Sequence, residues 1–186
     1  GAGVIGCSAA YHLALRGARV VVLDTRGVAA VQSSKSWGFC RQQGRDVREL
    51  HLMCESMQRW NKIEDELGFS VGWQQCGNLA LCDSSKRWEQ FQKWMPMAQN
   101  NGVDTSLLGP TELRELLPRL EGEWLGGVWT ASDGSADPDS ATRAFARAAE
   151  LRGVQFRLFA PRVEALELQG GRVQGVRLET GEVLSA

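Results

Sequence analysis

The chain opens with the stretch that decides its fold: GAGVIG at residues 1–6, an alanine- and leucine-rich stretch at 7–16, Gly17, and ARVVVLD at 18–24. The alanine- and leucine-rich stretch favours a helix, and a glycine directly after it is a common helix end. A continuous β-branched run is typical of a strand buried on both faces, as parallel strands are. Glycine turn, helix, strand and terminal acid, in this order, predict a mononucleotide-binding unit.

Each glycine of this GxGxxG pattern has a physical task. Gly1 permits the tight turn, Gly3 lets the backbone approach a pyrophosphate without a Cβ, and Gly6 lets the helix pack closely on the sheet. The helix N-terminus offers free N–H groups and a partial positive charge to phosphates. Asp24 follows Gly6 by 18 residues and is expected to accept hydrogen bonds from both ribose hydroxyls of an adenosine.

The order of elements after Asp24 favours FAD over a nicotinamide cofactor. In an NAD domain a second helix and a third strand should follow quickly. Here an irregular, serine-rich loop at 27–43, a long helix at about 46–67 and a strand-rich insertion intervene. A helix–strand unit resumes only at Asp137-Pro138, which suits a helix start because it joins an N-cap acid to a proline. Such an interruption leaves room for a long cofactor and a substrate-facing layer.

Apolar periodicity and turn residues predict the remaining elements. Pro96 is expected to kink or shorten its helix. The expected helices start near residues 46, 85, 111 and 137, and the expected strands are 69–73, 77–82, 126–130, 154–159, 163–168, 172–178 and 182–184.

Composition and charge exclude several classes of protein. The 186 residues, 43% apolar and 23% charged, suit a packed core of one domain or one and a fraction. The net charge of −1 gives no electrostatic reason to expect a nucleic-acid partner. The apolar runs are too short for a transmembrane segment. Five scattered cysteines without a CxxC pair, beside two histidines, disfavour a zinc site and predict a reducing, cytoplasmic location.

Both ends of the chain bear on the expected fold class. A dinucleotide glycine motif should follow a strand, none precedes Gly1, and the chain stops just after a strand. The sequence therefore predicts an α/β fold: a Rossmann-like FAD-binding domain with an inserted β-rich substrate domain, truncated at both ends. The expected division is 1–69 and 133–186 for the FAD-binding domain and 70–132 for part of the substrate domain. Such a fragment is expected to be inactive alone.

Four stretches resemble the D-amino-acid oxidase family of FAD-dependent amine oxidoreductases, which includes glycine oxidase, sarcosine oxidase and D-amino-acid dehydrogenases. They are the glycine turn at 1–6, VLD at 22–24, QSSKSWGFCRQQ at 32–43 and DGSADP at 133–138. The tail, with Val163 and the turn Thr180-Gly181, is similar to the family's closing pattern. The resemblance covers nearly the whole chain and about the first half of such a protein.

The resemblance implies FAD as the cofactor and assigns roles to residues. The Ser33-Ser34 loop should touch the FAD pyrophosphate and ribityl chain, the segment 37–39 should run beside the isoalloxazine ring, and Val163 should offer backbone groups to the adenine. Asp24 stands where glutamate is commoner, and Trp37 and Phe39 are bulkier than is usual, which would change the active-site volume. The predicted cofactor-binding residues are Gly1, Gly3, Gly6, Asp24, Ser33, Ser34, Trp37, Gly38, Phe39 and Val163; no catalytic residue or metal ligand is assigned.

Several of these residues have a simpler structural interpretation. Ser33 and Ser34 can cap a turn, and Trp37 can fill a core. Arg41 can be a surface charge, a partner of the flavin N1 side or a carboxylate-binding group, because its fork suits a carboxylate. His51 is expected to be a surface or interface histidine rather than a catalytic one.

The implied function is FAD-dependent oxidation of an amine or amino acid. Hydride leaves the carbon next to nitrogen for flavin N5, and water hydrolyses the imine product. The partners would be a small amine or amino-acid substrate and either oxygen or an electron carrier as acceptor. The alternatives are an FAD enzyme for a hydroxy acid or a modified tRNA base, an NAD(P)-dependent dehydrogenase, and a nucleotide-binding module without catalysis.

Overall fold

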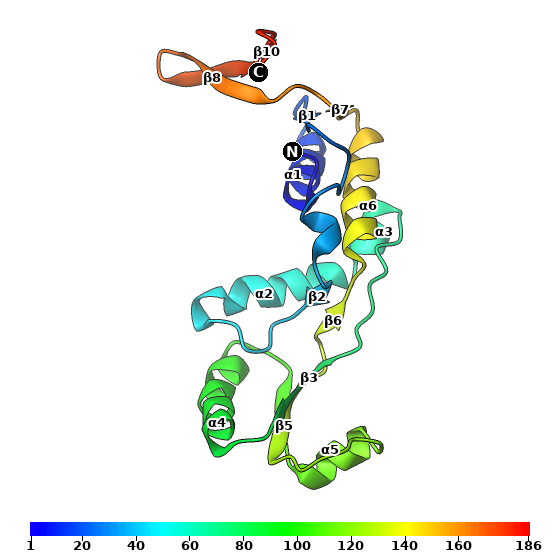
Figure 1. Cartoon of the computed structure of the whole chain (residues 1–186), viewed down its shortest axis with the longest axis vertical. Helices are drawn as coiled ribbons and strands as arrows, with labels where there is room; N and C mark the ends of the chain where they lie inside the picture. The colour runs from blue at the N-terminus through cyan, green and yellow to red at the C-terminus, as the bar shows by residue number, and fades with distance from the viewer. The chain divides into compact units, whose positions relative to one another are not determined.

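The computed structural model describes residues 1–186 and divides them into two compact units. The first unit comprises Gly1–Ser36, Leu67–Phe69 and Pro138–Ala186, and the second comprises Trp37–Glu66 and Ser70–Asp137. Each unit is therefore built from stretches that are distant in the sequence, as the colours of Figure 1 show. No helix has the length and apolar character that crossing a membrane requires.

Helix α1 (Val4–Leu15) and strand β1 (Val21–Leu23) of the first unit follow the glycine turn, as the sequence predicts. Helix α6 (Pro138–Glu150) lies beside α1 and leads to β7 (Gln155–Arg157), which pairs with β1 in parallel (Figure 1). Tyr11 of α1 meets Phe145 of α6 edge-on, with ring centroids 5.9 Å apart. The facing side of α6 is rich in alanine, which lets the two helices approach closely.

Strand β1 differs from the prediction in one respect. Val22 is buried, but Val21 is 49% exposed, so the expectation of a strand buried on both faces is wrong for Val21. Strand β1 has one hydrogen-bonded neighbour, β7, and successive side chains of a strand point to opposite faces. Burial of Val22 therefore leaves Val21 on the other face.

The C-terminal part of the first unit is an antiparallel sheet. Its strands β8 (Val163–Gln169), β9 (Arg172–Leu178) and β10 (Val183–Ser185) lie in the order β10-β9-β8. Gly170 and Gly171 connect β8 to β9 with φ of +58° and +75°. A two-residue hairpin turn with both central φ angles positive suits glycine best. The three predicted strands and this turn are confirmed.

The second unit is built on a three-stranded antiparallel sheet. Strand β5 (Gly126–Thr130) lies between β3 (Asn78–Cys82) and β4 (Thr105–Leu108). Helix α4 (Ser85–Asn100) packs against this sheet, and α5 (Pro110–Leu116) follows β4. Pro96 lies inside α4, which continues to Asn100, and β4 is a strand that the sequence did not predict.

The helix predicted at 46–67 is two helices, α2 (Val47–Trp60) and α3 (Ile63–Leu67). Asp46 caps α2 by accepting the N–H of Arg48 at 2.9 Å. At the break, Asn61 Oδ1 accepts from Trp73 Nε1 at 3.0 Å. The apolar periodicity alone would continue the helix past Asn61. The structure has a break there, together with this tertiary contact to Trp73.

The strand predicted at 69–73 is wrong, because only Gln74 forms a β-bridge, with Ser135. The Glu64 carboxylate accepts the backbone N–H of Val71 at 2.7 Å. A side chain thus supplies the acceptor that a neighbouring strand would have supplied.

Three of the seven tryptophans of the chain have rings that lie against glycines of the second unit. A Cβ placed on Gly77 would lie 1.9 Å from the ring of Trp129, and one on Gly126 would lie 2.5 Å from Trp88. A Cβ on Gly134 would lie 2.6 Å from the ring of Trp73. At Gly77 the ring alone occupies the space of a side chain, whereas at Gly126 and Gly134 a backbone carbonyl oxygen, of Leu108 and of Gln74, lies still closer at 2.4 and 2.2 Å.

We expect Gly77→Ala to destabilise the protein more than Gly102→Ala. The two positions have nearly the same φ, +73° and +76°, but nothing lies within 4 Å of a Cβ on Gly102. Both substitutions carry the left-handed strain of about 1–2 kcal/mol, and only Gly77→Ala adds the overpacking penalty of about 1–3 kcal/mol against Trp129. Thermal unfolding of the two variants measures the difference; equal midpoints would contradict the tryptophan contact.

Candidate cofactor site

The glycine turn leads directly into the N-terminus of α1. Gly3 is the N-cap residue, and the first helical bond runs from Cys7 N–H to Gly3 C=O at 2.9 Å. The N–H groups of the first turn have no helical acceptor, as at every helix start. Such groups, together with the helix dipole, form an anion-binding position.

The spacing of the glycines is required by the tight turn itself. A Cβ on Gly6 would lie 1.9 Å from the carbonyl oxygen of Gly1, so no larger residue fits without moving the backbone. A Cβ on Gly3 would lie 3.0 Å from Ser33 Oγ. The prediction gave Gly6 the task of helix–sheet packing, whereas the atom that a Cβ would meet here belongs to the turn. The cradle in front of α1 exists because these positions have no side chains.

Asp24, directly after β1, is brought to the glycine turn. Its Oδ2 accepts the N–H of Ala2 at 2.7 Å, and its Oδ1 accepts the N–H of Arg26 at 2.7 Å. Burial by itself would raise the pKa of Asp24, but the two backbone N–H groups outweigh burial and lower it. The carboxylate is therefore charged at neutral pH, and each oxygen keeps a lone pair for a further donor such as a ribose hydroxyl.

Ser33 is also brought to the glycine turn, although it lies 29 residues after its hydrogen-bond partner Val4 in the sequence. It begins the short 3₁₀ helix η1 (Ser33–Lys35), and its Oγ accepts the N–H of Val4 at 2.9 Å. The Ser33 hydroxyl thus caps α1 where Gly3 has no side chain to do so. The Ser34 hydroxyl instead donates to Val31 O at 3.3 Å and is exposed.

Val163 lies apart from this cluster in the hydrogen-bond network. It is the first residue of β8, pairs with Leu178 of β9 and is 46% exposed. No hydrogen bond joins it to Asp24 or to the glycine turn.

The segment 37–39 belongs to the second unit, and its two aromatic side chains are exposed. Trp37 is 88% exposed and Phe39 is 63% exposed, so the interpretation of Trp37 as core filling is wrong. Gly38 has φ of +74°, which glycine adopts readily. Strand β2 (Phe39–Cys40) pairs with β6 (Gly134–Ser135), so two short stretches that the sequence singled out are neighbours.

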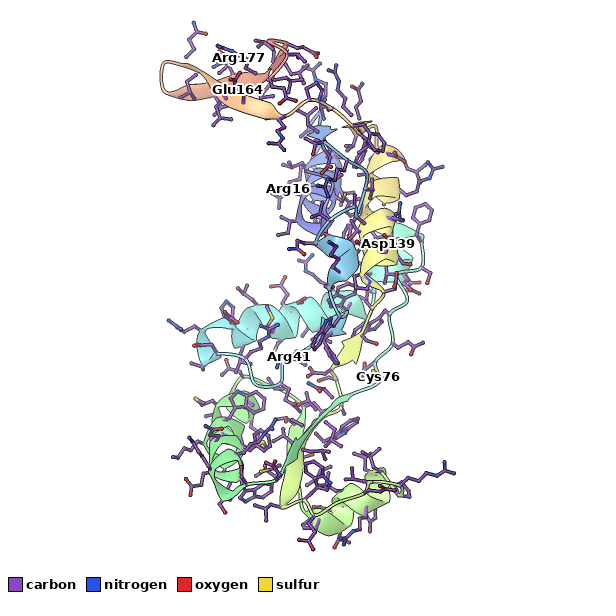
Figure 2. The ribbon with its side chains drawn as sticks, in the orientation of Figure 1. Arg16, Arg41, Cys76, Asp139, Glu164 and Arg177 are labelled. Carbon is purple, nitrogen blue, oxygen red and sulfur yellow. The ribbon has the colours of Figure 1, made fainter.

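Arg41 lies on the stretch between β2 and α2 (Figure 2). Its Nη1 donates to Gln43 O at 2.8 Å, and the side chain forms no ion pair with a carboxylate. Arg41 is an exposed residue, and its guanidinium keeps N–H donors beyond the one that Gln43 O accepts. His51 is exposed on α2.

A buried polar cluster beside Arg41 escaped the sequence prediction. Asp133 has no exposed surface and accepts the N–H of Gln42 at 2.7 Å and that of Gln43 at 3.2 Å. The Gln43 side chain donates to Val128 O at 2.9 Å. The signal in the sequence was the pair of adjacent glutamines, yet nothing in it links them to an acid about 90 residues away.

The cysteines are all free thiols, and three of them have raised pKa values. Burial raises the pKa of Cys40, in β2, to about 11, with the charge of Asp133 adding to it. Burial likewise raises the pKa of Cys7 to about 11. At neutral pH these two thiols are protonated, which makes them poor nucleophiles. No three metal-ligating side chains gather in one place.

We expect a thiol reagent at pH 8 to label Cys76 before Cys40 and Cys7. Cys76 is exposed, whereas Cys7 is buried, Cys40 is partly buried, and the pKa of each of these two thiols is raised to about 11. Peptide mass spectrometry at successive reaction times measures the order. Rapid labelling of Cys40 at pH 8 would contradict the described environment of β2.

One protein-family model, "DAO: FAD dependent oxidoreductase", matches residues 1–186. The chain is 29% identical over 192 residues to sarcosine dehydrogenase, mitochondrial, of Homo sapiens, covering 98% of this chain and 21% of that protein. It is 30% identical over 165 residues to dimethylglycine dehydrogenase, mitochondrial, of Rattus norvegicus, covering 87% and 19%. The crystal structure of L-proline dehydrogenase from P. horikoshii superposes with a TM-score of 0.90 at 30% identity, covering 100% and 49%.

The chain thus spans about a fifth of the length of these two dehydrogenases and about half of the solved one. The residues present fit the cofactor on which this family depends, because the glycine turn has no side chains in front of α1 and two polar side chains converge on it. The α/β fold, the glycine cradle and a match over residues 1–186 place the chain in DAO, the family of FAD dependent oxidoreductases.

Proposed function

We propose that the chain is the FAD-binding part of a flavoenzyme that oxidises a secondary amine or an α-amino acid. The observation that carries the proposal is the convergence of Asp24 and Ser33 on the glycine turn. We assign 1–69 and 133–186 to the FAD-binding domain and 70–132 to the substrate domain. When bound, FAD accepts hydride from the carbon next to the substrate nitrogen, and the resulting imine is hydrolysed.

The glycine turn and α1 are proposed to hold the pyrophosphate of FAD. Gly1, Gly3 and Gly6 leave the space, and the first-turn N–H groups of α1 supply donors. The Ser33 hydroxyl accepts from Val4 N–H and still has its own proton to donate, so it can join the helix to a phosphate oxygen. Ser34, in the same 3₁₀ turn, is exposed and free to offer a second hydroxyl to the pyrophosphate or ribityl chain once its bond to Val31 O is exchanged.

The two ends of the cofactor are assigned to different residues. Asp24 would accept the ribose hydroxyls, and the backbone of Val163, at the start of an edge strand of its sheet, would recognise the adenine. Trp37, Gly38 and Phe39 would line the flavin ring. The exposure of Trp37 and Phe39 supports this assignment, because neighbouring exposed aromatic side chains often mark a binding site.

The substrate class follows from the relatives' printed names and from Arg41. Sarcosine, dimethylglycine and proline are all N-substituted α-amino acids, so they share a carboxylate and a carbon–nitrogen bond. An exposed guanidinium without a carboxylate partner suits recognition of such a carboxylate. The electron acceptor would be oxygen or an electron carrier.

The NAD(P) alternative is disfavoured by the family's dependence on FAD. The absence of a nucleic-acid partner and the cytoplasmic location stay predictions, and two of the relatives are described as mitochondrial.

The proposed function is tested with the full-length protein that contains this chain. The purified protein should be yellow with flavin absorption, and substrate should bleach it without oxygen. A panel of sarcosine, dimethylglycine and proline, set against hydroxy acids of equal size, identifies the substrate class. A colourless protein that oxidises a substrate only with NAD(P) would contradict the proposal.

A further inference from the structure

The starting observation is a buried carboxylate whose partners are all neutral. Asp133 lies between β5 and β6 with no exposed surface. Its Oδ1 accepts Gln42 N–H at 2.7 Å, and its Oδ2 accepts Gln43 N–H at 3.2 Å and Asn78 Nδ2 at 3.3 Å. No cation pairs with it. A buried charge without a counter-ion persists only where hydrogen-bond donors surround it, so these donors are essential.

The side chains of the two glutamines are fixed as well. Gln43 Nε2 donates to Asn78 O and Val128 O, both at 2.9 Å, and to Thr130 Oγ1 at 3.2 Å. Gln42 Nε2 donates to Ser132 Oγ at 2.9 Å. The Gln43 side chain is therefore held to strands β3 and β5, and the Gln42 side chain is held to Ser132, which follows β5.

This anchored pair lies directly beside the exposed segment that we assign to flavin and substrate. The N–H of Gln43 donates to Asp133, and the carbonyl oxygen of Gln43 accepts from Arg41 Nη1 at 2.8 Å. On the other side, Ala136 N–H donates to Gly38 O at 3.0 Å, and β2 pairs with β6, which begins immediately after Asp133. Residues 38–43 are thus tied at both ends to the stretch 133–136.

A carboxylate is an unusual choice for a role that is only structural. Well-packed apolar residues can replace a buried ionic group with little loss of stability. A buried acceptor that binds two consecutive N–H groups does what an apolar residue cannot, because it selects one conformation of that peptide. Rigid support under exposed binding groups lowers the ordering entropy lost on binding.

We propose that Asp133 is a positioning residue: it fixes the backbone of Gln42 and Gln43 and, through the Gln43 carbonyl, the guanidinium of Arg41. Arg41 is thereby presented to an anionic substrate group in one orientation. We call the hydrogen bonds from the Gln42 and Gln43 N–H groups to Asp133 the clamp. The assignment of the anionic substrate group rests on the proposed function, whereas the clamp does not.

The decisive variant is Asp133→Asn in the full-length flavoprotein. It keeps the shape but turns an NH₂ group toward donors, so at least one loop N–H loses its acceptor. We expect amide hydrogen exchange at Gln42 and Gln43 to accelerate about tenfold or more. The loss of a hydrogen bond to a charged acceptor changes an equilibrium constant by about tenfold or more. The KM for the amine substrate should rise by a similar factor, with a smaller change in kcat and an unchanged flavin content.

Two matched controls separate positioning from stability. Asn78→Ala removes one bond to Asp133 but leaves both loop N–H bonds, so it should lower the unfolding temperature while the KM stays near that of the wild type. Asp139→Asn removes an exposed carboxylate that pairs with Arg143 and should change neither quantity. Equal loss of stability in Asp133→Asn and Asn78→Ala, with unchanged KM and loop exchange, would overturn the proposal.

If Asp133→Asn fails to fold, amide hydrogen exchange of the wild-type protein still tests the proposal. The Gln42 and Gln43 amides should then exchange as slowly as those of β5, and exchange at the rate of exposed loops would overturn the proposal. This readout needs neither flavin nor substrate. A wild-type protein without flavin but with protected Gln42 and Gln43 amides would contradict the proposed function and leave the clamp supported.

Discussion

Gly6→Ala is expected to abolish FAD binding in the full-length protein. The added Cβ would lie 1.9 Å from the carbonyl oxygen of Gly1, far inside van der Waals contact, and backbone rather than a flexible side chain stands in its way. The turn must open, which moves the first-turn N–H groups of α1 away from the pyrophosphate. Flavin absorbance of the purified protein, and titration of the apo-protein with FAD, measure the loss.

The control is another glycine of the same unit. Gly17→Ala places a Cβ at the end of α1, where φ is +81° and nothing lies within 4 Å. It should lower the unfolding temperature through backbone strain yet leave the FAD content unchanged. Full flavin loading of Gly6→Ala would show that the turn at residues 1–6 does not hold the cofactor.

Asp24→Ala is expected to weaken FAD binding by about tenfold or more, because a hydrogen bond to a charged acceptor contributes about 1.5–3 kcal/mol. The variant also releases the N–H groups of Ala2 and Arg26, which fix the glycine turn. Asp24→Asn separates the two contributions, since its single oxygen retains only part of the turn contacts. Quenching of tryptophan fluorescence during FAD titration measures the affinity, and unchanged affinity in Asp24→Ala would remove Asp24 from the site.

The same carboxylate predicts a pH dependence with a definite sign. The pKa of Asp24 is lower in the folded protein than in the unfolded chain. Its contribution to the free energy of unfolding is therefore fully present above the unfolded pKa of about 4 and is lost as pH falls through the folded value. The difference in the free energy of unfolding between wild type and Asp24→Asn should be largest above pH 4 and should shrink as pH falls from about 4 through the folded pKa.

Some elements were predictable because the information lies within a few residues. The turn at Gly170-Gly171 follows from the need for two positive φ angles, and the start of α6 follows from Asp137-Pro138. Strand β4 was missed because its four residues carry little signal of their own, and pairing with β5 stabilises them. The long helix at 46–67 was overextended, since the break at Asn61 accompanies a contact with Trp73.

The sequence by itself determined the glycine turn, α1, the acid after β1 and hence the family of cofactor. These features depend on backbone freedom and on side chains at fixed short spacings. Only the tertiary structure decided which polar groups meet: Asp24 with Ala2, Ser33 with Val4, and Asp133 with Gln42. Their separations of 22, 29 and 91 residues leave no periodic trace, because a single long-range hydrogen bond imposes no pattern on the chain between its partners.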